Sequence, residues 1–193
     1  MRNQKALAEQ LHYLFTNVTA PYSYRRCKNL LGIDLDTIQD YIHFAEMAKV
    51  LFEVPHFAYS LRAQTRPNRK IYCIGNGLRN AVSFRFSEDK GKLAENLVFI
   101  ELLRSGATPF YWKKKKEVDF VVKGPDNLLT AINVSYADAI SAREKDGLQE
   151  FAGEFGYRMK EMIILTKDTE QVDGDITFVP LWKWLLSKNG LPI

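Results

Sequence analysis

The chain of 193 residues is 46% hydrophobic, 12% aromatic and 26% charged, which is typical of a globular protein and excludes wholesale disorder or a collagen-like repeat. Its 27 Lys and Arg residues against 23 Asp and Glu residues give a formal charge of +4, too small for a histone-like binder. Cys27 and Cys73 lack any CxxC spacing, which predicts neither a zinc site nor a disulfide framework and favours a cytoplasmic protein. No stretch approaches the roughly 20 apolar residues of a membrane span, so we expect no membrane partner.

Residues 1–65 have the pattern of a helical domain. Apolar residues recur at helical spacing over residues 7–15, which predicts a first helix. A second helix is expected to begin after an N-cap at Ser23 and to end at Gly32, and a third to begin near Asp36. Because a strand-like apolar run follows these three short helices, the pattern suggests an all-α, winged-helix-like domain.

Residues 66–193 alternate helices with strands. We place the domain boundary at the polar residues 66–69, which include a proline. The expected order of helices and strands predicts an α/β domain in which helices pack on a mixed sheet, so the whole chain is an α+β multidomain protein. The expected elements are a strand at 70–74, a helix at 93–105, strands at 108–113, 116–123 and 128–136, a helix at 142–156, strands at 161–166 and 176–179, and a helix at 181–187.

Polar side chains gather on two strands and one helix of this second domain. Charged and apolar residues alternate over 117–122, so Glu117 and Asp119 are expected on one face and the apolar residues on the other. Asn133 and Ser135 share a face of the next strand, and Glu95 lies on the preceding helix. Metal-dependent phosphodiesterases use such a layout, because carboxylate oxygens hold Mg²⁺ against a phosphate. A solvated strand edge, paired with the lysines of the preceding turn, is the alternative interpretation.

A set of short motifs resembles a known family. The motifs are KIYCIGNGL at 70–78, ENLVF at 95–99, ELLRSG at 101–106, YW at 111–112, KEVDF at 116–120, RE at 143–144 and GL at 147–148. Together they resemble the C-terminal region of prokaryotic AAA+-type ATPases of unknown function. Members of that family typically combine a P-loop ATPase domain, a winged helix and a domain resembling the PD-(D/E)XK restriction-endonuclease fold. The resemblance covers the chain from about residue 10 and implies a restriction-endonuclease-like domain with a mixed sheet at 66–193.

The resemblance also implies a catalytic set. Glu95 matches the acid of the nuclease helix and Asp119 the first acid of the catalytic motif, and these two would hold Mg²⁺ in an active site. Asn133 and Ser135 fall where the family has an acid or amide and, two residues later, a lysine. Asn133 still offers an oxygen, but Ser135 has no ammonium to stabilise a pentavalent phosphate. We therefore expect a degenerate nuclease site without a certain cofactor, in a binding or regulatory module linked to nucleic acid.

The missing lysine leaves two other functions open. An active Mg²⁺-dependent endonuclease needs a lysine from elsewhere, such as Lys116 or Lys123, although Lys123 lies roughly 13 Å along the strand from Asp119. A protein-interaction or assembly module that binds no nucleic acid is the second alternative, and either can form a homo-oligomer. The sequence contains no GxxxxGK[ST] motif, so we assign no ATP hydrolysis to it and expect an ATPase domain in the same full-length chain.

Positive charge for a DNA partner is available in several segments. The third helix is acidic and contains neither Lys nor Arg, which disfavours insertion into the major groove and leaves contacts to the DNA backbone or to a protein. The residue at the start of helix 142–156, Arg143, is expected to contact a phosphate, or to pair with Asp119 if the site is retired. The other candidates form three groups: Arg25, Arg26 and Lys28 on the second helix; Arg62, Arg66, Arg69 and Lys70 in a basic wing; and Lys114 and Lys115 in the run from Lys113 to Lys116. A solvated turn between two strands is the alternative interpretation of this lysine run.

Overall fold

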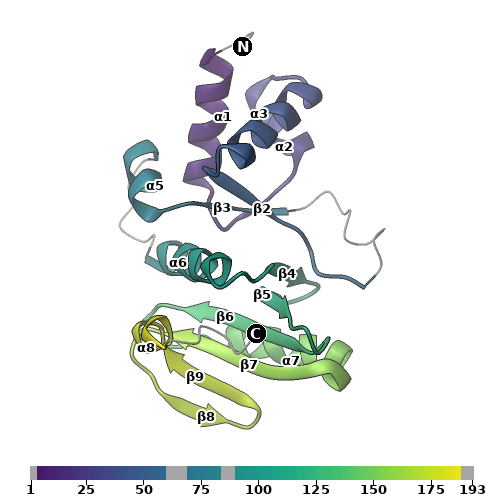
Figure 1. Ribbon diagram of the computed structural model, residues 1–193, viewed down its shortest axis with the longest axis vertical. Helices are drawn as coiled ribbons and strands as arrows, with labels where there is room; N and C mark the ends of the chain where they lie inside the picture. The colour runs from purple at the N-terminus through teal and green to yellow at the C-terminus, as the bar shows by residue number, and fades with distance from the viewer. Residues whose placement is uncertain (1–3, 60–68, 84–89, 188–193) are drawn as a thin grey trace.

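The computed structural model describes residues 4–59, 69–83 and 90–187. An N-terminal helical part lies above an α/β part, and the helix α6 runs between them (Figure 1). The N-terminal part contains α1 (Gln4–Thr16), β1 (Pro21–Tyr22), α2 (Tyr24–Leu31), α3 (Leu35–Met47), β2 (Leu51–Val54) and β3 (Arg69–Cys73). Its three strands form an antiparallel sheet in the order β1-β3-β2.

The caps of α2 confirm the sequence prediction. The Ser23 side chain accepts a hydrogen bond from the backbone N–H of Arg26. Gly32 has a φ of 66°, in the left-handed region that favours glycine, and its N–H donates to the carbonyl of Lys28. The local sequence therefore fixes both ends of this helix.

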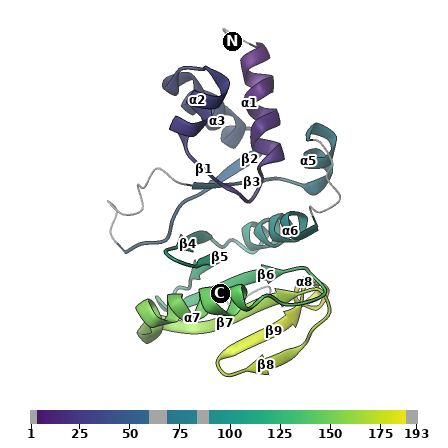
Figure 2. The ribbon, with the colours of Figure 1, turned by 180° about the vertical axis from the view of Figure 1, so that it is seen from behind.

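The C-terminal part is built on a six-stranded mixed sheet in the order β4-β5-β6-β7-β9-β8. Strands β6, β7 and β9 are parallel, whereas β4, β5 and β8 pair antiparallel with their neighbours. Helix α7 covers one face of the sheet, and α6 and α8 cover the other (Figure 2). The elements are α5 (Asn76–Val82), α6 (Lys90–Arg104), β4 (Phe110–Lys113), β5 (Glu117–Lys123), β6 (Leu129–Ser135), α7 (Ala142–Phe155), a 3-10 helix η1 (Gly156–Arg158), β7 (Met159–Thr166), β8 (Gln171–Asp173), β9 (Ile176–Pro180) and α8 (Leu181–Leu186).

The predicted division into a helical part and an α/β part with a mixed sheet is confirmed, with additions. The first part is not all-α, because it contains the sheet of β1, β2 and β3. The predicted boundary at residues 65 and 66 lies outside the described residues, and so does the part of the basic wing that holds Arg62 and Arg66. The strand that follows the boundary, β3, pairs with strands that precede it. None of the helices in the described ranges has the length and apolar character needed to cross a membrane.

The N-terminal sheet packs directly on α6. The ring of Tyr72, on β3, stacks on Phe99 of α6 with centroids 4.5 Å apart and an interplanar angle of 17°, and Phe52 of β2 lies 5.5 Å from the same ring. Tyr72 also contacts the ring of Phe120 on β5, at 5.4 Å. This packing carries β3 across α6 to the edge of the large sheet, where its side chains reach the predicted acidic residues.

The alternation expected over residues 117–122 is broken in the middle of β5. Val118 packs in the cluster under α7, whereas Phe120 and Val122 pack in the cluster under α6, so these three apolar residues do not share a face as predicted. The pairing of β4 with β5 shifts register between Phe110 and Trp112, opposite this point. The irregularity is the physical reason for the difference, because one extra residue in a strand reverses the faces beyond it.

Candidate functional site

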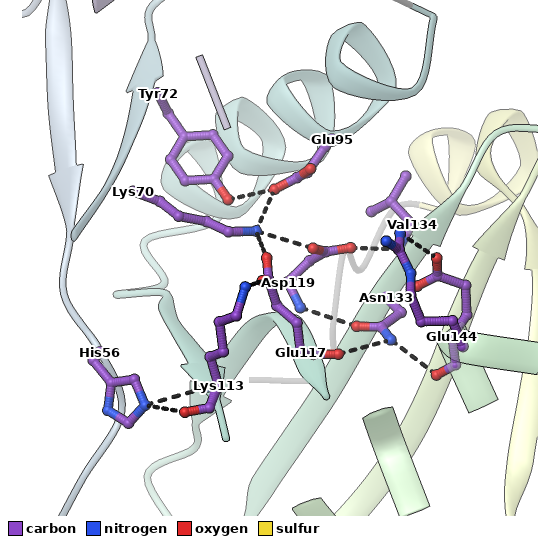
Figure 3. A network of polar contacts seen from close by, with 11 residues as sticks. His56, Lys70, Tyr72, Glu95, Lys113, Glu117, Asp119, Asn133, Val134 and Glu144 are labelled. Atoms are coloured by element: carbon purple, nitrogen blue, oxygen red, sulfur yellow. Dashed lines mark hydrogen bonds and ion pairs between the residues drawn. The ribbon is translucent and has the colours of Figure 1, made fainter. Parts of the chain in front are cut away.

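Three acidic side chains converge on one buried ammonium group. The Nζ atom of Lys70 lies 2.7 Å from Oε1 of Glu117, 2.9 Å from Oε1 of Glu95 and 3.0 Å from Oδ1 of Asp119 (Figure 3). The side chain of Lys70 is 1% exposed. The hydroxyl of Tyr72 donates to the same oxygen of Glu95 at 2.7 Å. The structure therefore brings together Glu95 and Asp119, as the resemblance implied, around a lysine that sequence analysis had placed in a basic wing.

The electrostatics of this cluster follow from burial and from its excess of acid. Burial, and then the neighbouring Asp119, raise the pKa of Glu95 to about 7 despite the ammonium beside it. Burial alone would lower the pKa of Lys70, but the acidic neighbours, Glu95 foremost, hold that pKa well above its ordinary value. Burial also opposes ionisation of Glu117, yet its pKa is lowered because it contacts both Lys70 and Lys113. Lys70 is thus permanently charged at neutral pH.

Asp119 and Asn133 hold β5 and β6 together where the regular ladder between the strands ends. The ladder runs from Lys123 opposite Leu129 to Phe120 opposite Ile132 and stops there. Beyond it, Oδ1 of Asn133 accepts the backbone N–H of Asp119 at 2.9 Å, and Oδ2 of Asp119 accepts the N–H of Val134 at 3.0 Å. These side-chain contacts replace the missing backbone bonds and fix the carboxylate of Asp119 toward Lys70.

Asn133, which the resemblance places in the catalytic set, has its side-chain amide engaged in hydrogen bonds to neighbouring backbone groups. It is fully buried, and its amide group donates to the carbonyl of Glu144 on α7 at 2.9 Å and to that of Glu117 at 3.4 Å. Its oxygen is engaged by the N–H of Asp119. All its polar atoms therefore serve the junction of β5, β6 and α7, which lies on the far side of the strand from Lys70.

Close approach of α7 to β5 depends on Gly147. A Cβ atom built on this glycine would lie 2.2 Å from the carbonyl oxygen of Glu117 and 3.3 Å from Nδ2 of Asn133. The first distance is much shorter than a van der Waals contact. The atom that the Cβ would meet belongs to the backbone, which cannot move aside as a flexible side chain can. The helix approaches Glu117 this closely only because residue 147 has no side chain.

The remaining residues predicted for the site lie beside the cluster. Ser135, at the end of β6, is buried and lines a cavity of about 470 Å³ together with Arg143 and Glu144. Arg143 pairs with Glu144 at 3.1 Å instead of with Asp119, the partner expected of a retired site, because Lys70 already neutralises that carboxylate. Glu144 is largely buried, and burial followed by the nearby charge of Asp119 raises its pKa.

The lysine run of the β4–β5 turn is neutralised by acidic residues. Lys113 pairs with Glu117 at 2.8 Å, as the salt-bridged interpretation of this strand edge expects. Three acids spaced four residues apart along α7 meet the rest of the turn. Lys114 pairs with Glu154 at 2.7 Å, Lys116 pairs with Asp146 at 2.7 Å, and Glu150 accepts the backbone N–H groups of Lys115 and Lys116. The side chain of Lys116 is therefore engaged by α7, and the lysine found at the three carboxylates is Lys70.

The predicted cationic residues of α2 lie on the surface of the N-terminal part, away from the lysines of the β4–β5 turn (Figure 1). Arg25, Arg26 and Lys28 are exposed on the surface of the N-terminal part. Arg69, which was assigned to the basic wing, instead pairs with Glu53 of β2 at 3.0 Å. The cationic residues of α2 are thus exposed, as are Lys114, Lys115 and Arg143 of the C-terminal part.

The residues at the cluster do not fit a divalent cation as the structure has them. In the ranges that the structure describes, no group of three or more His, Cys, Asp or Glu side chains is arranged to hold a metal ion. The three carboxylates do share a centre, but the ammonium of Lys70 occupies it. A cation at that centre would meet repulsion from Lys70, so the cluster as the structure has it does not accommodate one.

Comparison with known proteins divides the chain into two matches. Residues 90–184 match a family described as "Domain of unknown function (DUF4143)", and residues 1–89 match one described as "Domain of unknown function (DUF8612)". The two matches meet at α6, so the lysine of the cluster belongs to the DUF8612 match and its carboxylates to the DUF4143 match.

The curated relatives are themselves uncharacterized. A protein of the archaeon Methanocaldococcus jannaschii is 30% identical over 201 residues, covering 95% of this chain and 44% of the relative. A protein of the bacterium Haemophilus influenzae is 28% identical over 152 residues, covering 78% of this chain and 37% of the relative. The chain therefore spans less than half the length of these relatives. No solved structure matches.

Sequence reasoning missed Lys70, Tyr72 and Gly147 as members of the site. Lys70 and Tyr72 stand two positions apart on one strand and lie in the KIYCIGNGL motif, so period-two alternation could have placed both on one face. Gly147 lies in the GL motif in the middle of a predicted helix, where a glycine is unfavourable and so signals a packing role.

Proposed function

We propose that the chain is the non-ATPase part of a AAA+-like ATPase, and that it acts as a nucleic-acid-linked binding or regulatory module built on a nuclease-like site that does not cleave. One observation carries the proposal: an ammonium group, from a lysine on β3, occupies the point where the three carboxylates of the nuclease-like site converge. The chain spans less than half the length of the curated relatives, which supports its being part of a larger protein.

The lysine performs the electrostatic task that a metal would otherwise perform at these acids. Contacts of 2.7 to 3.0 Å suit charge-assisted hydrogen bonds between an ammonium and carboxylates. A Mg²⁺ ion needs closer, octahedral contacts of about 2.1 Å and usually keeps several waters. Because Lys70 is 1% exposed and fixed between β3 and β5, its ammonium stabilises the junction of the two parts instead of activating a water.

The arrangement of the N-terminal part supports the link to nucleic acid. The order α1-β1-α2-α3-β2-β3, with an antiparallel sheet β1-β3-β2, is the order of a winged-helix domain. Its open cationic surface is on α2, which carries Arg25, Arg26 and Lys28. Helix α3 is acidic, so contacts would go to the phosphate backbone and not to base edges.

Cleavage and binding assays test the proposal together. Labelled single- and double-stranded DNA is incubated in Mg²⁺ and in Mn²⁺ with the wild type, Lys70→Met and Asp119→Ala. We expect no cleavage from any of the three. Cleavage by the wild type that both substitutions abolish would overturn the proposal and identify Lys70 as the working lysine of an endonuclease.

Binding is measured by fluorescence anisotropy over a salt series, since phosphate contacts weaken steeply with salt. We expect the combined substitution of Arg25, Arg26 and Lys28 by Gln to weaken binding and flatten the salt slope. Lys160→Gln, at the start of β7, is the matched control and should leave both unchanged. Equal affinity of the triple variant and the wild type would refute the role of α2.

A protein-interaction role is the second candidate, and the exposed face of α3 favours it. Phe44 and Met47 are 52% and 68% exposed, beside the exposed acids Asp36 and Asp40. Such a face suits a basic and apolar protein surface better than a polyanion. DNA binding absent at every salt concentration, together with self-association in sedimentation velocity that Phe44→Ser abolishes, would establish this candidate in place of the first.

A further inference from the structure

Two adjoining cavities lie at the carboxyl ends of the parallel strands β6 and β7. Each has a volume of about 470 Å³, and Lys90, Tyr136 and Ala137 line both. In α/β sheets, ligands bind in crevices outside the carboxyl ends of the strands. Lys70, Glu95, Glu117 and Asp119 are not among the described residues that line either cavity, although Val134 of the second cavity donates its backbone N–H to Asp119.

The first cavity has an apolar floor and a polar rim. Leu93, Ala94 and Leu97 of α6 and Leu181 of α8 form the floor, beside the ring of Tyr136. The rim contains Asn76, Lys90, Asp138 and Lys167, and the last two form an ion pair at 2.6 Å. An apolar floor next to an aromatic ring suits a flat ring system with polar edges.

The second cavity is polar and carries cationic groups. It is lined by the hydroxyl-bearing residues Ser135 and Ser141, by Arg143 and Glu144, and by Lys90. Arg143 is 76% exposed in its side chain and uses one nitrogen on Glu144, so the rest of its five N–H donors can bind an anion. This lining suits a phosphate group.

The ammonium of Lys70 reduces the electrostatic repulsion that an anion in the second cavity would meet. Val134, whose side chain lines the second cavity, donates its backbone N–H to Asp119. Asp119 is the nearest member of the acidic cluster and would repel a phosphate if its charge were uncompensated. Because Lys70 lies 3.0 Å from this carboxylate, its ammonium offsets part of the negative charge that the neighbouring cavity faces.

We propose that the two cavities together bind a nucleotide, with its phosphate between Lys90 and Arg143 and its base against Tyr136, Leu97 and Leu181. The shared chemistry is an aromatic base joined to a phosphate. Its source is either a free mononucleotide or one unit of a nucleic-acid strand. The inference stands apart from the proposed function, because a free nucleotide can bind even if the chain has no affinity for DNA.

The test titrates the whole chain with nucleoside 5′-monophosphates by isothermal titration calorimetry. Separate titrations use a nucleoside alone and inorganic phosphate alone, which are the two component parts of a monophosphate. We expect a monophosphate to bind more tightly than either half. Lys90→Gln and Arg143→Gln should each weaken binding by about tenfold, the loss of one charged hydrogen-bond partner. Leu97→Trp, which fills the floor, should remove the contribution of the base and leave the affinity for inorganic phosphate unchanged.

Controls separate this inference from the proposed function. Lys160→Gln, at the opposite end of β7, should bind monophosphates as the wild type does. A short oligothymidylate that monophosphates displace would identify a strand as a source, whereas monophosphate binding without oligonucleotide binding identifies a free nucleotide. Monophosphates that bind no better than inorganic phosphate, or that bind Lys90→Gln and the wild type equally, would overturn the inference even where α2 binds DNA.

Discussion

Replacement of Lys70 by Met tests whether this ammonium holds the two parts of the chain together. Met has a similar length but no charge, so the substitution leaves Glu95, Glu117 and Asp119 without their shared partner at 2.7 to 3.0 Å. Removing one partner of a buried ion pair typically costs about 3–5 kcal/mol. We expect the free energy of unfolding to fall by that amount at neutral pH in urea titrations followed by circular dichroism.

The pH dependence of this loss distinguishes charge from packing. Without the ammonium, burial and mutual repulsion oppose ionisation of these acids, Glu95 foremost, so the folded variant takes up protons that the unfolded chain has released. The variant should therefore regain stability as the pH falls toward about 5, and its deficit against the wild type should shrink. A lost methylene contact would give the same deficit at both pH values.

Two further variants keep the test decisive. Lys114→Met removes an exposed pair with Glu154 and should cost less than about 1 kcal/mol. If Lys70→Met alone does not fold, adding Glu95→Gln removes one uncompensated charge and should restore folding. A loss below about 1 kcal/mol in Lys70→Met, or a loss independent of pH, would refute the reasoning.

Three other substitutions probe the surroundings of the cluster. Because the pKa of Glu95 is about 7 in the fold and near 4.5 in the unfolded chain, its contribution to stability is present below about pH 4.5 and is lost as the pH rises toward 7. Glu95→Gln should reduce the change in the free energy of unfolding between pH 4.5 and pH 7 by up to about 3 kcal/mol. An unchanged pH dependence in urea titrations would contradict the raised pKa of Glu95. Gly147→Ala should destabilise the protein by about 2 kcal/mol or more in thermal unfolding, because its Cβ would lie 2.2 Å from a backbone oxygen, whereas Gly153→Ala on the same helix meets nothing within 4 Å and should stabilise it slightly. Asn133→Ala leaves the N–H of Asp119 buried without its acceptor and should cost about 2 kcal/mol or more, with equal stability to the wild type as the contrary result.

The sequence predicted most of the regular elements because their signals are local. Ser23 and Gly32 bound α2 as expected, and the strands and helices of the second part fall close to their predicted ranges. The missed elements are short: β1 has two residues, β8 has three and α5 has seven. β1 is fixed by its pairing with the distant strand β3, and segments as short as β8 contain too few residues for a periodic pattern to show.

The acidic half of the site could be predicted, but its cation could not. Glu95, Glu117 and Asp119 were named from the sequence, and the structure brings all three to one atom. The resemblance expects the lysine at the position of Ser135, and the sequence offers Lys116 and Lys123 as alternatives. The lysine lies instead on β3, in a different sheet, and tertiary contacts such as the packing of Tyr72 on Phe99 bring that strand within reach.

The short motifs that seemed independent in the sequence meet at this junction. KIYCIGNGL supplies Lys70 and Tyr72, ENLVF supplies the glutamate of α6, KEVDF supplies the two acids of β5, and GL supplies the glycine that lets α7 approach them. Each motif alone is compatible with an ordinary helix or strand. Their residues share one contact network, in which a charge from the N-terminal sheet is balanced by charges from the C-terminal part. The folding of the two parts is therefore coupled, because separating them would break the contacts of Glu95, Glu117 and Asp119 with the ammonium of Lys70.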